Sequence, residues 1–366
     1  MIVPFNDVSR LNARYSANIR SAIDSVLRSG ELILGSVVDS FETEFARFCG
    51  TEGSVGVANA TDGLEIALRA AGCGSGSEVI VAGNAGGYST VAAIAIGATP
   101  VFADVDPRTL LIDAESVVSV ISERTRAVIV THLYGGVVDV ERLRGMLPKH
   151  IVIIEDGSQA HGARINDSSV GSLGDLAVFS FYPTKNLGAV GDAGAVTGRN
   201  SELLDAVREL RQYGWGSRYR INRAFGRNSR LDPVQAATLL VKIADVGAVN
   251  SERIRIADFI ATESGHVDSF VHRAFGDDVI HAGHLCVITH PDRDSFARRL
   301  AARGVPTAVH FPTADHLQAP LKDLVMIRNP LHATELACSR VLSLPCFPGM
   351  TEEERHVIVE AVRTEW

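Results

Sequence analysis

The chain has 366 residues, of which 46% are hydrophobic and 21% are charged, and its formal net charge is −8. These values are typical of a soluble globular protein with room for two domains, or for one large unit with an appended piece. The acidic balance argues against a nucleic-acid or anionic-membrane partner, although it still permits an anionic small substrate.

Targeting and redox features point to the cytoplasm. The start, MIVPFNDVSR, turns polar too early for a secretion signal. The longest apolar stretch, residues 91–102, is shorter than the roughly 20 residues that span a bilayer. Five cysteines without a CxxC pattern favour a reducing compartment, so we expect a cytoplasmic protein without a membrane partner.

Along the first 250 residues, short β-branched runs alternate with segments of helical period. Helices are predicted at residues 17–28, 59–71, 201–211 and 231–244. Strands are predicted at residues 78–82, 100–105, 126–132, 150–156 and 176–181. Apolar strands separated by helices predict an α/β fold, with a mostly parallel sheet covered on both faces in a three-layer α/β/α domain.

The composition shifts after Val249. A polar helix candidate, NSERIRIADFIATESG, is followed by HLCVITH and then by DRDSFARRLAARG. This order predicts a smaller α+β domain over residues 250–366, next to a large domain over residues 1–249.

The glycine-rich stretch GCGSG, Gly72–Gly76, invites a dinucleotide-loop interpretation. A phosphate-binding glycine loop should follow a strand and open a helix, but here a helix precedes and a strand follows. We therefore predict a helix-to-strand turn. The motifs GxxxxGK[ST], HExxH and GxSxG do not occur, and no metal site is predicted.

Three other features could carry chemistry, each with a plain structural alternative. NATDGL, Asn59–Leu64, opens a predicted helix whose free N–H groups suit a phosphate, or is simply an N-cap. Asp156 ends an apolar strand, where ligands bind in α/β sheets, or caps the next turn. Lys185, in FSFYPTKNLGAVGDAGAV, could be a desolvated amine that forms a Schiff base, or a surface lysine in a turn. Its nearby glycines would let the backbone approach a ligand.

The three features fit one ligand together. Pyridoxal phosphate (PLP) needs an anion site, an acid facing its pyridinium nitrogen and a lysine for its aldehyde. The sequence therefore favours a PLP site built from the start of a helix, Asp156 and Lys185.

A resemblance to a known family covers nearly the whole chain, from about Pro4. It rests on the motifs SFYPTKNLGAVGDAGAV, EDGSQAHGA, GVANATDGLEIAL, GATPVFADVDP, RNSRLDPVQAA and LSLPCFPGMTEEE. Together these resemble the DegT/DnrJ/EryC1/StrS sugar aminotransferases, which are PLP-dependent enzymes of fold type I. The resemblance implies a homodimer with shared active sites. It also implies amino transfer from L-glutamate, through pyridoxamine phosphate, to a nucleotide-linked keto sugar.

The resemblance also implies residue roles. Lys185 would bind PLP and shuttle protons, Asp156 would pair with the pyridinium nitrogen, and Gln159 would contact the ring's 3-hydroxyl. The phosphate would be held by Ser180, Thr61, the backbone of Ala60 and Asp62, and Asn228 of the neighbouring subunit. Substrate-side positions would be Tyr182, Arg230, His310 and His316, with Arg230 also a candidate for the subunit interface.

Some segments depart from the family pattern. Where the family has an aromatic residue that stacks on PLP, in a segment like NTYIAT, this chain reads NAGGYST, and we expect its glycine pair to bring Tyr88 over the ring. YGGVVDV, residues 134–140, lacks a usual glutamine, and Asp315 replaces a commonly apolar residue. These last two changes put the substrate in doubt more than the chemistry.

We expect a dTDP-3-keto-6-deoxyhexose as the acceptor, with a 4-keto nucleotide sugar or an inosose as the alternative. A PLP-dependent dehydratase of the same fold is disfavoured, because such members replace the Schiff-base lysine with histidine. A non-catalytic regulatory protein is disfavoured because Lys185, Asp156 and Gln159 are all present.

Overall fold

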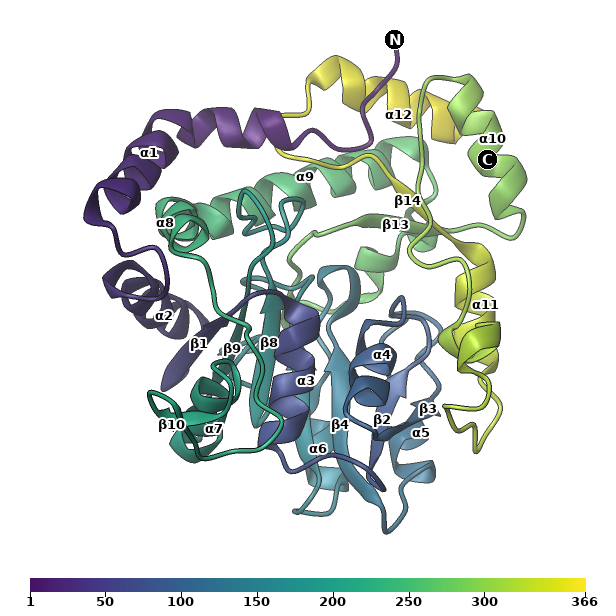
Figure 1. Cartoon of the computed structure of the whole chain (residues 1–366). Coiled ribbons are helices and arrows are strands. Elements are labelled where there is room, and N and C mark those ends of the chain that lie inside the picture. Colours follow the sequence, from purple (N-terminus) through teal and green to yellow (C-terminus); the bar gives the residue numbers. More distant parts are fainter.

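The computed structural model describes the whole chain, residues 1–366, around a central seven-stranded sheet (Figure 1). Across the sheet the strands are β1 (Gly53–Val57), β9 (Gly194–Gly198), β8 (Leu176–Ser180), β5 (Val152–Asp156), β4 (Thr125–Thr131), β2 (Glu78–Ala82) and β3 (Thr99–Ala103). From β8 to β3 every neighbouring pair is parallel, and only β9 runs against its neighbours. The predicted mostly parallel sheet is confirmed.

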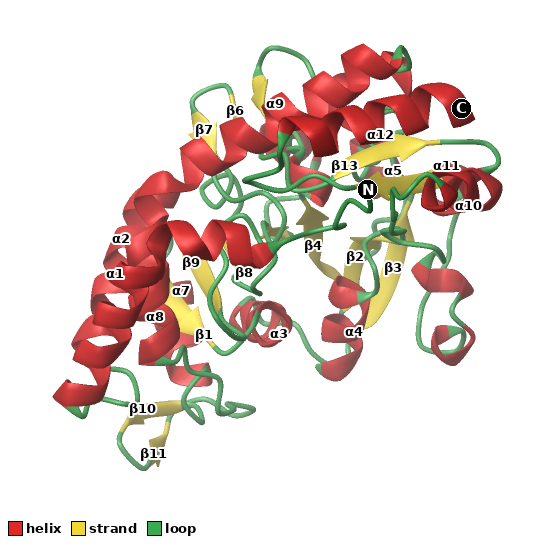
Figure 2. Cartoon of the chain, turned by 90° about the horizontal axis from the view of Figure 1, so that it is seen from above, coloured by secondary structure: helices red, strands yellow, loops and turns green.

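Helices cover both faces of this sheet. Because strand side chains alternate, Val79 and Val81 of β2 point into one apolar core and Ile80 into another. The first face carries α3 (Ala60–Ala70), α4 (Tyr88–Ala95) and α7 (Ser201–Leu210), and Figure 2 shows α3 and α4 side by side on it. The opposite face carries α2 (Ser36–Cys49), α5 (Ala114–Ser119), α6 (Val140–Met146) and α8 (Pro233–Lys242). The three-layer prediction is therefore confirmed.

The C-terminal part has a core of its own, which lies above the sheet in Figure 1. Helices α9 (Val246–Ser264), α10 (Arg293–Ala302) and α12 (Glu352–Glu365) pack there around the antiparallel pair β13 (Cys286–Thr289) and β14 (Val341–Leu344). Helix α11 (His332–Arg340) packs instead against the large unit. The predicted division between residues 249 and 250 falls inside α9, whose Val246 packs with the large unit while Ile256 joins the C-terminal core.

The remaining short strands form two small sheets outside the central one. Strands β6 (Arg164–Ile165), β7 (Ser168–Ser169) and β12 (Val279–Ile280) form one small sheet. Strands β10 (Trp215–Ser217) and β11 (Arg220–Ile221) form a hairpin at the edge of the large unit (Figure 2). GCGSG lies between α3 and β2, so the predicted turn is confirmed.

Local capping residues set several helix starts. Asp7 caps α1 (Val8–Ser29), which therefore begins well before the predicted helix at residues 17–28. Asp232 caps α8, and Pro233 occupies its first turn, so this helix begins two residues later than predicted. No helix combines the length and the apolar composition that a membrane-spanning segment needs.

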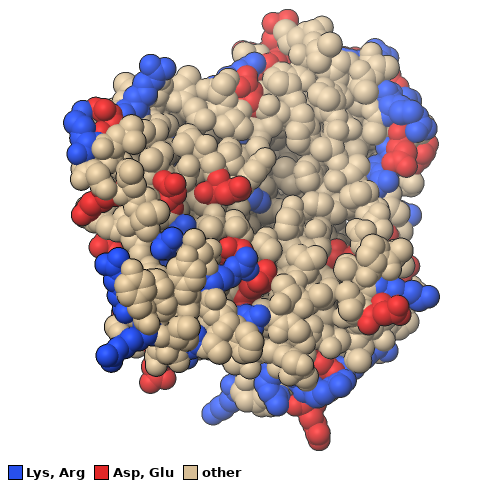
Figure 3. Space-filling model, in the orientation of Figure 1, with Lys and Arg blue, Asp and Glu red and all other residues tan.

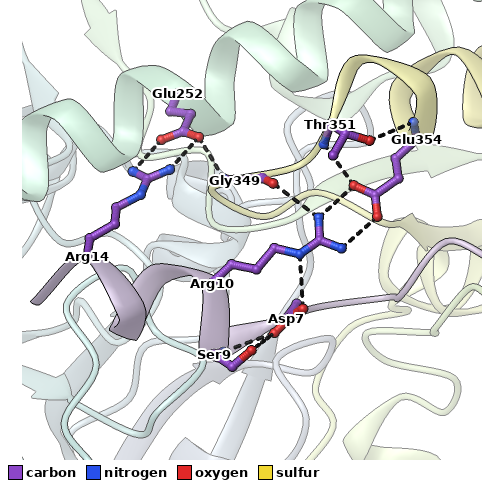
Figure 4. Close-up of polar contacts among 8 residues, drawn as sticks. All are labelled: Asp7, Ser9, Arg10, Arg14, Glu252, Gly349, Thr351 and Glu354. Carbon is purple, nitrogen blue, oxygen red and sulfur yellow. Dashed lines mark hydrogen bonds and ion pairs between the residues drawn. The ribbon is translucent and has the colours of Figure 1, made fainter. Parts of the chain in front are cut away.

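Helix α1 ties the N-terminus to the C-terminal unit (Figure 4). The Arg10 guanidinium donates to both carboxylate oxygens of Glu354, at 2.7 and 2.8 Å, and to the carbonyl of Gly349 at 3.1 Å. Arg14 makes a similar two-bond pair with Glu252, at 2.7 and 2.9 Å. Both carboxylates also accept backbone N–H groups, so these pairs fix chain segments as well as charges.

We expect Glu354→Gln to lower the free energy of unfolding by about 1–3 kcal/mol, because it weakens two charge-assisted bonds from Arg10 and the bond from the Thr351 N–H. Urea unfolding followed by circular dichroism measures this change. The matched control is Glu353→Gln, an exposed glutamate one residue earlier in α12. Equal unfolding midpoints for the two variants would contradict the prediction.

Candidate active site

A cavity of about 580 Å³ lies at the carboxyl edge of the sheet and is also lined by the C-terminal unit. Thr131, Asp156 and Ser180, the last residues of the adjacent strands β4, β5 and β8, all line it. Figure 3 shows a recess near the middle of this face, with largely uncharged walls. The cavity thus occupies the position where ligands bind in α/β sheets.

Lys185 lines the cavity from the turn that follows β8. Its backbone N–H donates to the carbonyl of Tyr182 at 2.8 Å, and Phe181, four residues earlier, is anchored edge-on against Phe41 and Phe45. Burial lowers the pKa of Lys185 from 10.5 to about 8, and the Asp156 carboxylate opposes this shift. The surface-lysine alternative is therefore wrong, and the amine loses its proton more readily than a solvated lysine does.

Two adjacent carboxylates at the end of β5 have different surroundings. Glu155 is fully buried and accepts backbone N–H groups from Gly171, Leu173 and Gly174, besides contacting His132 Nε2 at 3.0 Å. Asp156 lines the cavity, and its Oδ1 accepts only the Ser158 N–H, at 3.1 Å. Asp156 therefore retains the capacity to accept a hydrogen bond from a ligand, whereas Glu155 does not.

The start of α3, NATDGL, is both an N-cap and a part of the cavity wall that could hold a phosphate. Asn59 is an N-cap whose Oδ1 accepts the Asp62 N–H at 2.8 Å, while Ala60 and Thr61 line the cavity with first-turn N–H groups. Asp62 does not line it, because its N–H is used in the cap and its carboxylate pairs with Arg227 at 3.0 Å. The implied phosphate contact of the Asp62 backbone is therefore not supported.

The glycines after Lys185 serve packing rather than ligand approach. A Cβ at Gly194 would lie 2.7 Å from the carbonyl carbon of Asn59, and one at Gly188 would lie 2.4 Å from the Pro183 oxygen. Strand β9 can therefore pass close beside the start of α3, and the Lys185 turn can close, only without a side chain there. The expectation that these glycines let the backbone approach a ligand is therefore wrong for Gly188 and Gly194.

Five other predicted site residues reach the cavity. Gln159 lines it, and its Oε1 accepts the Tyr134 N–H at 2.7 Å, which leaves the amide N–H donors for a ligand. Ser180, Tyr182 and His310 also line it. Tyr88 begins α4, lines the cavity and meets Phe311 edge-on, with ring centroids 6.1 Å apart. Its stacking on a cofactor ring stays a prediction.

Three candidates lie outside the cavity of this chain. His316 is buried and contacts Glu335 at 3.1 Å and the Phe102 ring, so its predicted substrate contact is not supported. Asn228 is exposed, and Arg230 packs over the Tyr213 ring. Because the role implied for Asn228 is in a neighbouring subunit, a single chain leaves that role a prediction.

Asp315 also lies outside the cavity, so its departure from the family pattern has no direct bearing on substrate contact. It is 1% exposed, and its Oδ2 accepts the Thr90 hydroxyl at 2.6 Å, while Oδ1 has no partner. Burial raises the pKa of Asp315 from 3.8 to about 6, against the opposing Thr90 hydrogen bond. Burial also raises the pKa of nearby Cys338 to about 11, so this thiol stays neutral in the acid range.

We expect Asp315→Asn to stabilise the protein by roughly 3 kcal/mol at pH 8 and by little at pH 4. Because the folded-state pKa is raised, the native protein binds the proton more tightly than the unfolded chain does. The Asp315 contribution to stability therefore falls as the pH rises from about 3.8 to about 6, and the full cost is present above that range. Urea unfolding of both proteins across this pH range measures the difference, and a constant gap would contradict the prediction.

Sequence reasoning missed several lining residues from distant segments. Arg253 of α9 and His284, before β13, come from the C-terminal unit, and Phe5 comes from the N-terminal segment. His284 Nδ1 contacts Asn186 Oδ1 at 2.8 Å, next to Lys185 in the chain. Of these residues, only Arg253 carried a usable signal, as a cationic residue on a helix face otherwise rich in apolar residues.

The residues of the cavity fit pyridoxal phosphate. The fit rests on an amine of lowered pKa at Lys185, a carboxylate with spare acceptor capacity at Asp156, and N–H groups of Ala60 and Thr61 that no carbonyl of the helix satisfies. These groups match the aldehyde, the ring nitrogen and the phosphate of PLP, respectively.

Comparison with known proteins agrees with this fit. The model of the DegT/DnrJ/EryC1/StrS aminotransferase family matches residues 14–363. The dTDP-3-amino-3,6-dideoxy-alpha-D-galactopyranose transaminase of Aneurinibacillus thermoaerophilus is 41% identical over 364 residues, which is 99% of each chain.

Two solved structures are similar throughout. DesV of Streptomyces venezuelae, in complex with a ketimine intermediate, is 36% identical with a TM-score of 0.94, over 99% of this chain and 98% of that one. NtdA of Bacillus subtilis, with bound cofactor PMP, is 28% identical with a TM-score of 0.90, over 100% of this chain and 85% of that one.

Proposed function

Because the chain belongs to the DegT/DnrJ/EryC1/StrS aminotransferase family, we propose that it transfers an amino group from L-glutamate to a nucleotide-linked 3-keto-6-deoxyhexose. The chain is a PLP-dependent aminotransferase. The observation that carries the proposal is the meeting of Lys185, Asp156 and the start of α3 in one cavity. The choice of sugar is supported by the 41% identical relative, whose name specifies a dTDP-linked 3-amino-3,6-dideoxyhexose.

When bound, PLP supplies an aldehyde that takes up the amino group and a ring that accepts electrons from the reacting carbon. Lys185 would hold the aldehyde, and its Nζ would carry the proton that moves at the reacting carbon. Asp156 accepts a hydrogen bond from the ring nitrogen and holds a proton there. Gln159 donates to the ring's 3-oxygen through the amide group that Tyr134 leaves free.

The phosphate lies at the start of α3 in this proposal. The N–H groups of Ala60 and Thr61 donate to it, together with the hydroxyl groups of Thr61 and Ser180. These contacts fix one end of the cofactor, so the aldehyde stays within reach of Lys185.

The overall exchange needs no external oxidant or reductant. L-Glutamate loses its amino group and leaves as 2-oxoglutarate, and the carbonyl carbon of the sugar gains that amino group while its oxygen leaves as water. The water consumed in releasing 2-oxoglutarate balances the water formed at the sugar. Tyr182, which is exposed at the cavity, and the half-buried His310 are proposed to contact the sugar.

We also propose a homodimer in the cytoplasm. Beside Asn228 and Arg230, the hairpin segment exposes Tyr219, Ile221 and Phe225, large side chains that a second copy of the chain would cover. All five cysteines are free and buried, which suits a reducing compartment.

The two half-reactions test the function separately. The PLP-loaded protein is treated with L-glutamate, and the loss of its visible absorption band reports amine uptake. The aminated protein is then offered dTDP-linked 3-keto and 4-keto sugars and an inosose, and return of the band identifies the acceptor. Return only with an inosose or a 4-keto sugar would overturn the sugar assignment, and a band that no amino donor changes would overturn the donor assignment.

A further inference from the structure

Helix α9 places a cationic side chain in the active-site cavity. Arg253 is only 3% exposed, yet it lines the cavity together with Lys185. Arg255, two residues later, lines a separate cavity of about 640 Å³ instead. The two arginines of α9 therefore line two different cavities, and only Arg253 lines the active-site cavity.

The Arg253 guanidinium has no anionic partner in the protein. Its Nη1 donates to the carbonyls of His284 at 3.2 Å and Cys346 at 3.0 Å, and no carboxylate lies within ion-pair distance. Its buried Nε has no hydrogen-bond partner. An unpaired buried guanidinium costs several kcal/mol, and burial accordingly lowers the pKa of Arg253. A ligand anion would remove this cost.

The neighbouring basic groups do not compete with Arg253 as permanent cations. Burial lowers the pKa values of His284 and His310, in each case with a further contribution from Lys185, so both imidazoles are neutral near pH 7. Lys185 itself has a pKa of about 8 and is committed to the cofactor aldehyde. Arg253 therefore provides the fixed positive charge of the cavity for a substrate.

Arg253 is also linked to the lysine turn. The His284 carbonyl accepts from Arg253, and the His284 ring contacts Asn186, the residue after Lys185. Asn186 in turn donates to Asn250 of α9, at 2.7 Å. These short links hold the guanidinium on the side of the cavity where the amine reacts.

We propose that Arg253 binds a carboxylate of the amino donor through Nη2, because Nη1 donates to backbone carbonyls and Nε is buried. The inference rests on the proposed function, since it names the donor-binding group of the same site. A hydrogen bond from a guanidinium N–H to a carboxylate is charge-assisted, and it is about twice as strong as a bond between neutral groups. The sugar acceptor carries a carbonyl group at its reacting carbon and no carboxylate there. Arg253 therefore serves the donor half-reaction and distinguishes the two substrates that use one cavity in turn.

The test compares Arg253→Gln, Arg253→Lys and the control Arg255→Gln, which alters the same helix outside this cavity. Calorimetry measures binding of 2-oxoglutarate to the PLP-loaded proteins, which have no amine to give it and so cannot react. We expect Arg253→Gln to weaken this binding by about 10- to 100-fold, the effect of losing a charge-assisted pair. Arg253→Lys should recover part of the loss, and Arg255→Gln should bind as the wild type does.

The half-reactions add a readout that a purely structural role would not reproduce. In Arg253→Gln, the KM for L-glutamate should rise at least about 10-fold, while the KM for the keto sugar should change less than about threefold. Equal losses in both half-reactions with unchanged 2-oxoglutarate affinity would overturn the inference in favour of a structural role. A selective loss for the sugar would overturn it in favour of the nucleotide phosphates. If Arg253→Gln does not fold, unaltered 2-oxoglutarate binding in Arg253→Lys likewise overturns it.

These outcomes are separate from failure of the proposed function. Wild-type protein that binds 2-oxoglutarate but takes no amine from L-glutamate would refute the donor reaction, not the carboxylate site. Conversely, a normal wild-type donor reaction with no effect of Arg253→Gln would refute the carboxylate site alone.

Discussion

Lys185→Ala is expected to abolish amino transfer, with a rate loss of about 10⁴-fold or more. The substitution removes both the amine that binds PLP and the group that carries protons to the reacting carbon, and no other lysine lines the cavity. The visible band of the PLP-loaded protein should shift or vanish as well, because free PLP and lysine-bound PLP absorb differently. Stopped-flow spectroscopy with L-glutamate measures the rate, and a spectrum of the dialysed protein shows cofactor retention.

The matched control is Lys149→Ala, which removes an exposed lysine outside the cavity and should leave rate and spectrum unchanged. Lys185→Ala should also fold, because Lys185 contributes its backbone N–H to the hydrogen bonds of this turn, and the substitution keeps that group. Removing a desolvated amine should leave stability equal or higher. A Lys185→Ala protein that keeps the native band and transfers amine at a rate near the wild type would refute the assignment of this lysine.

The central part of the site was predictable because it depends on local sequence. Asp156 and Ser180 end apolar strands, and parallel strands bring their carboxyl ends to one edge of the sheet. Asn59 and Thr61 begin a helix that the apolar spacing already indicates. What the residues alone left open was whether Lys185 faces solvent or a cavity, and this depends on the C-terminal unit that covers it.

The site residues that the sequence did not predict reach the cavity through long-range packing. Arg253 and His284 reach the cavity only because α9 and the segment before β13 lie over the carboxyl edge of the sheet. His316 shows the opposite error, a residue predicted in the site that lies outside it. Although it is close to His310 in sequence, its side chain contacts Glu335 and does not line the cavity. The polar residue Asp315 was similarly misleading, because sequence position does not show that its carboxylate packs against Thr90 instead of a substrate.

Glu155 and Asp156 show how structure separates roles that sequence leaves equivalent. Both end the run IVIIED, and either could be placed at the strand end by composition. Side chains of successive strand residues point to opposite faces, so only one of the two can meet the cavity side of the strand. The hydrogen bonds assign Glu155 to the packing of residues 171–174 and leave Asp156 for a ligand.

We therefore expect opposite effects from the same chemical change at these two positions. Asp156→Asn should lower the rate of amine uptake by about 10³-fold, because a neutral amide cannot hold a proton on the ring nitrogen as a carboxylate does. Its unfolding free energy should change by less than about 1 kcal/mol, since Asp156 accepts only one backbone hydrogen bond.

Glu155→Gln should behave in the reverse way. An amide nitrogen would face backbone N–H groups that now donate to the carboxylate, and the contact with buried His132 would weaken. We expect a loss of about 3 kcal/mol or more in the free energy of unfolding. The folded fraction should still take up amine at close to the wild-type rate.

Urea unfolding and stopped-flow amine uptake, measured on the same preparations, compare the two variants directly. Each variant is the control for the other, because the substitutions remove the same charge at neighbouring residues of one strand. If Glu155→Gln lost the rate at unchanged stability while Asp156→Asn lost only stability, the two roles would have to be exchanged. If both variants lost only stability, neither carboxylate would touch the cofactor, and the acid partner of the ring nitrogen would have to be sought at Asp192, the other carboxylate that lines the cavity.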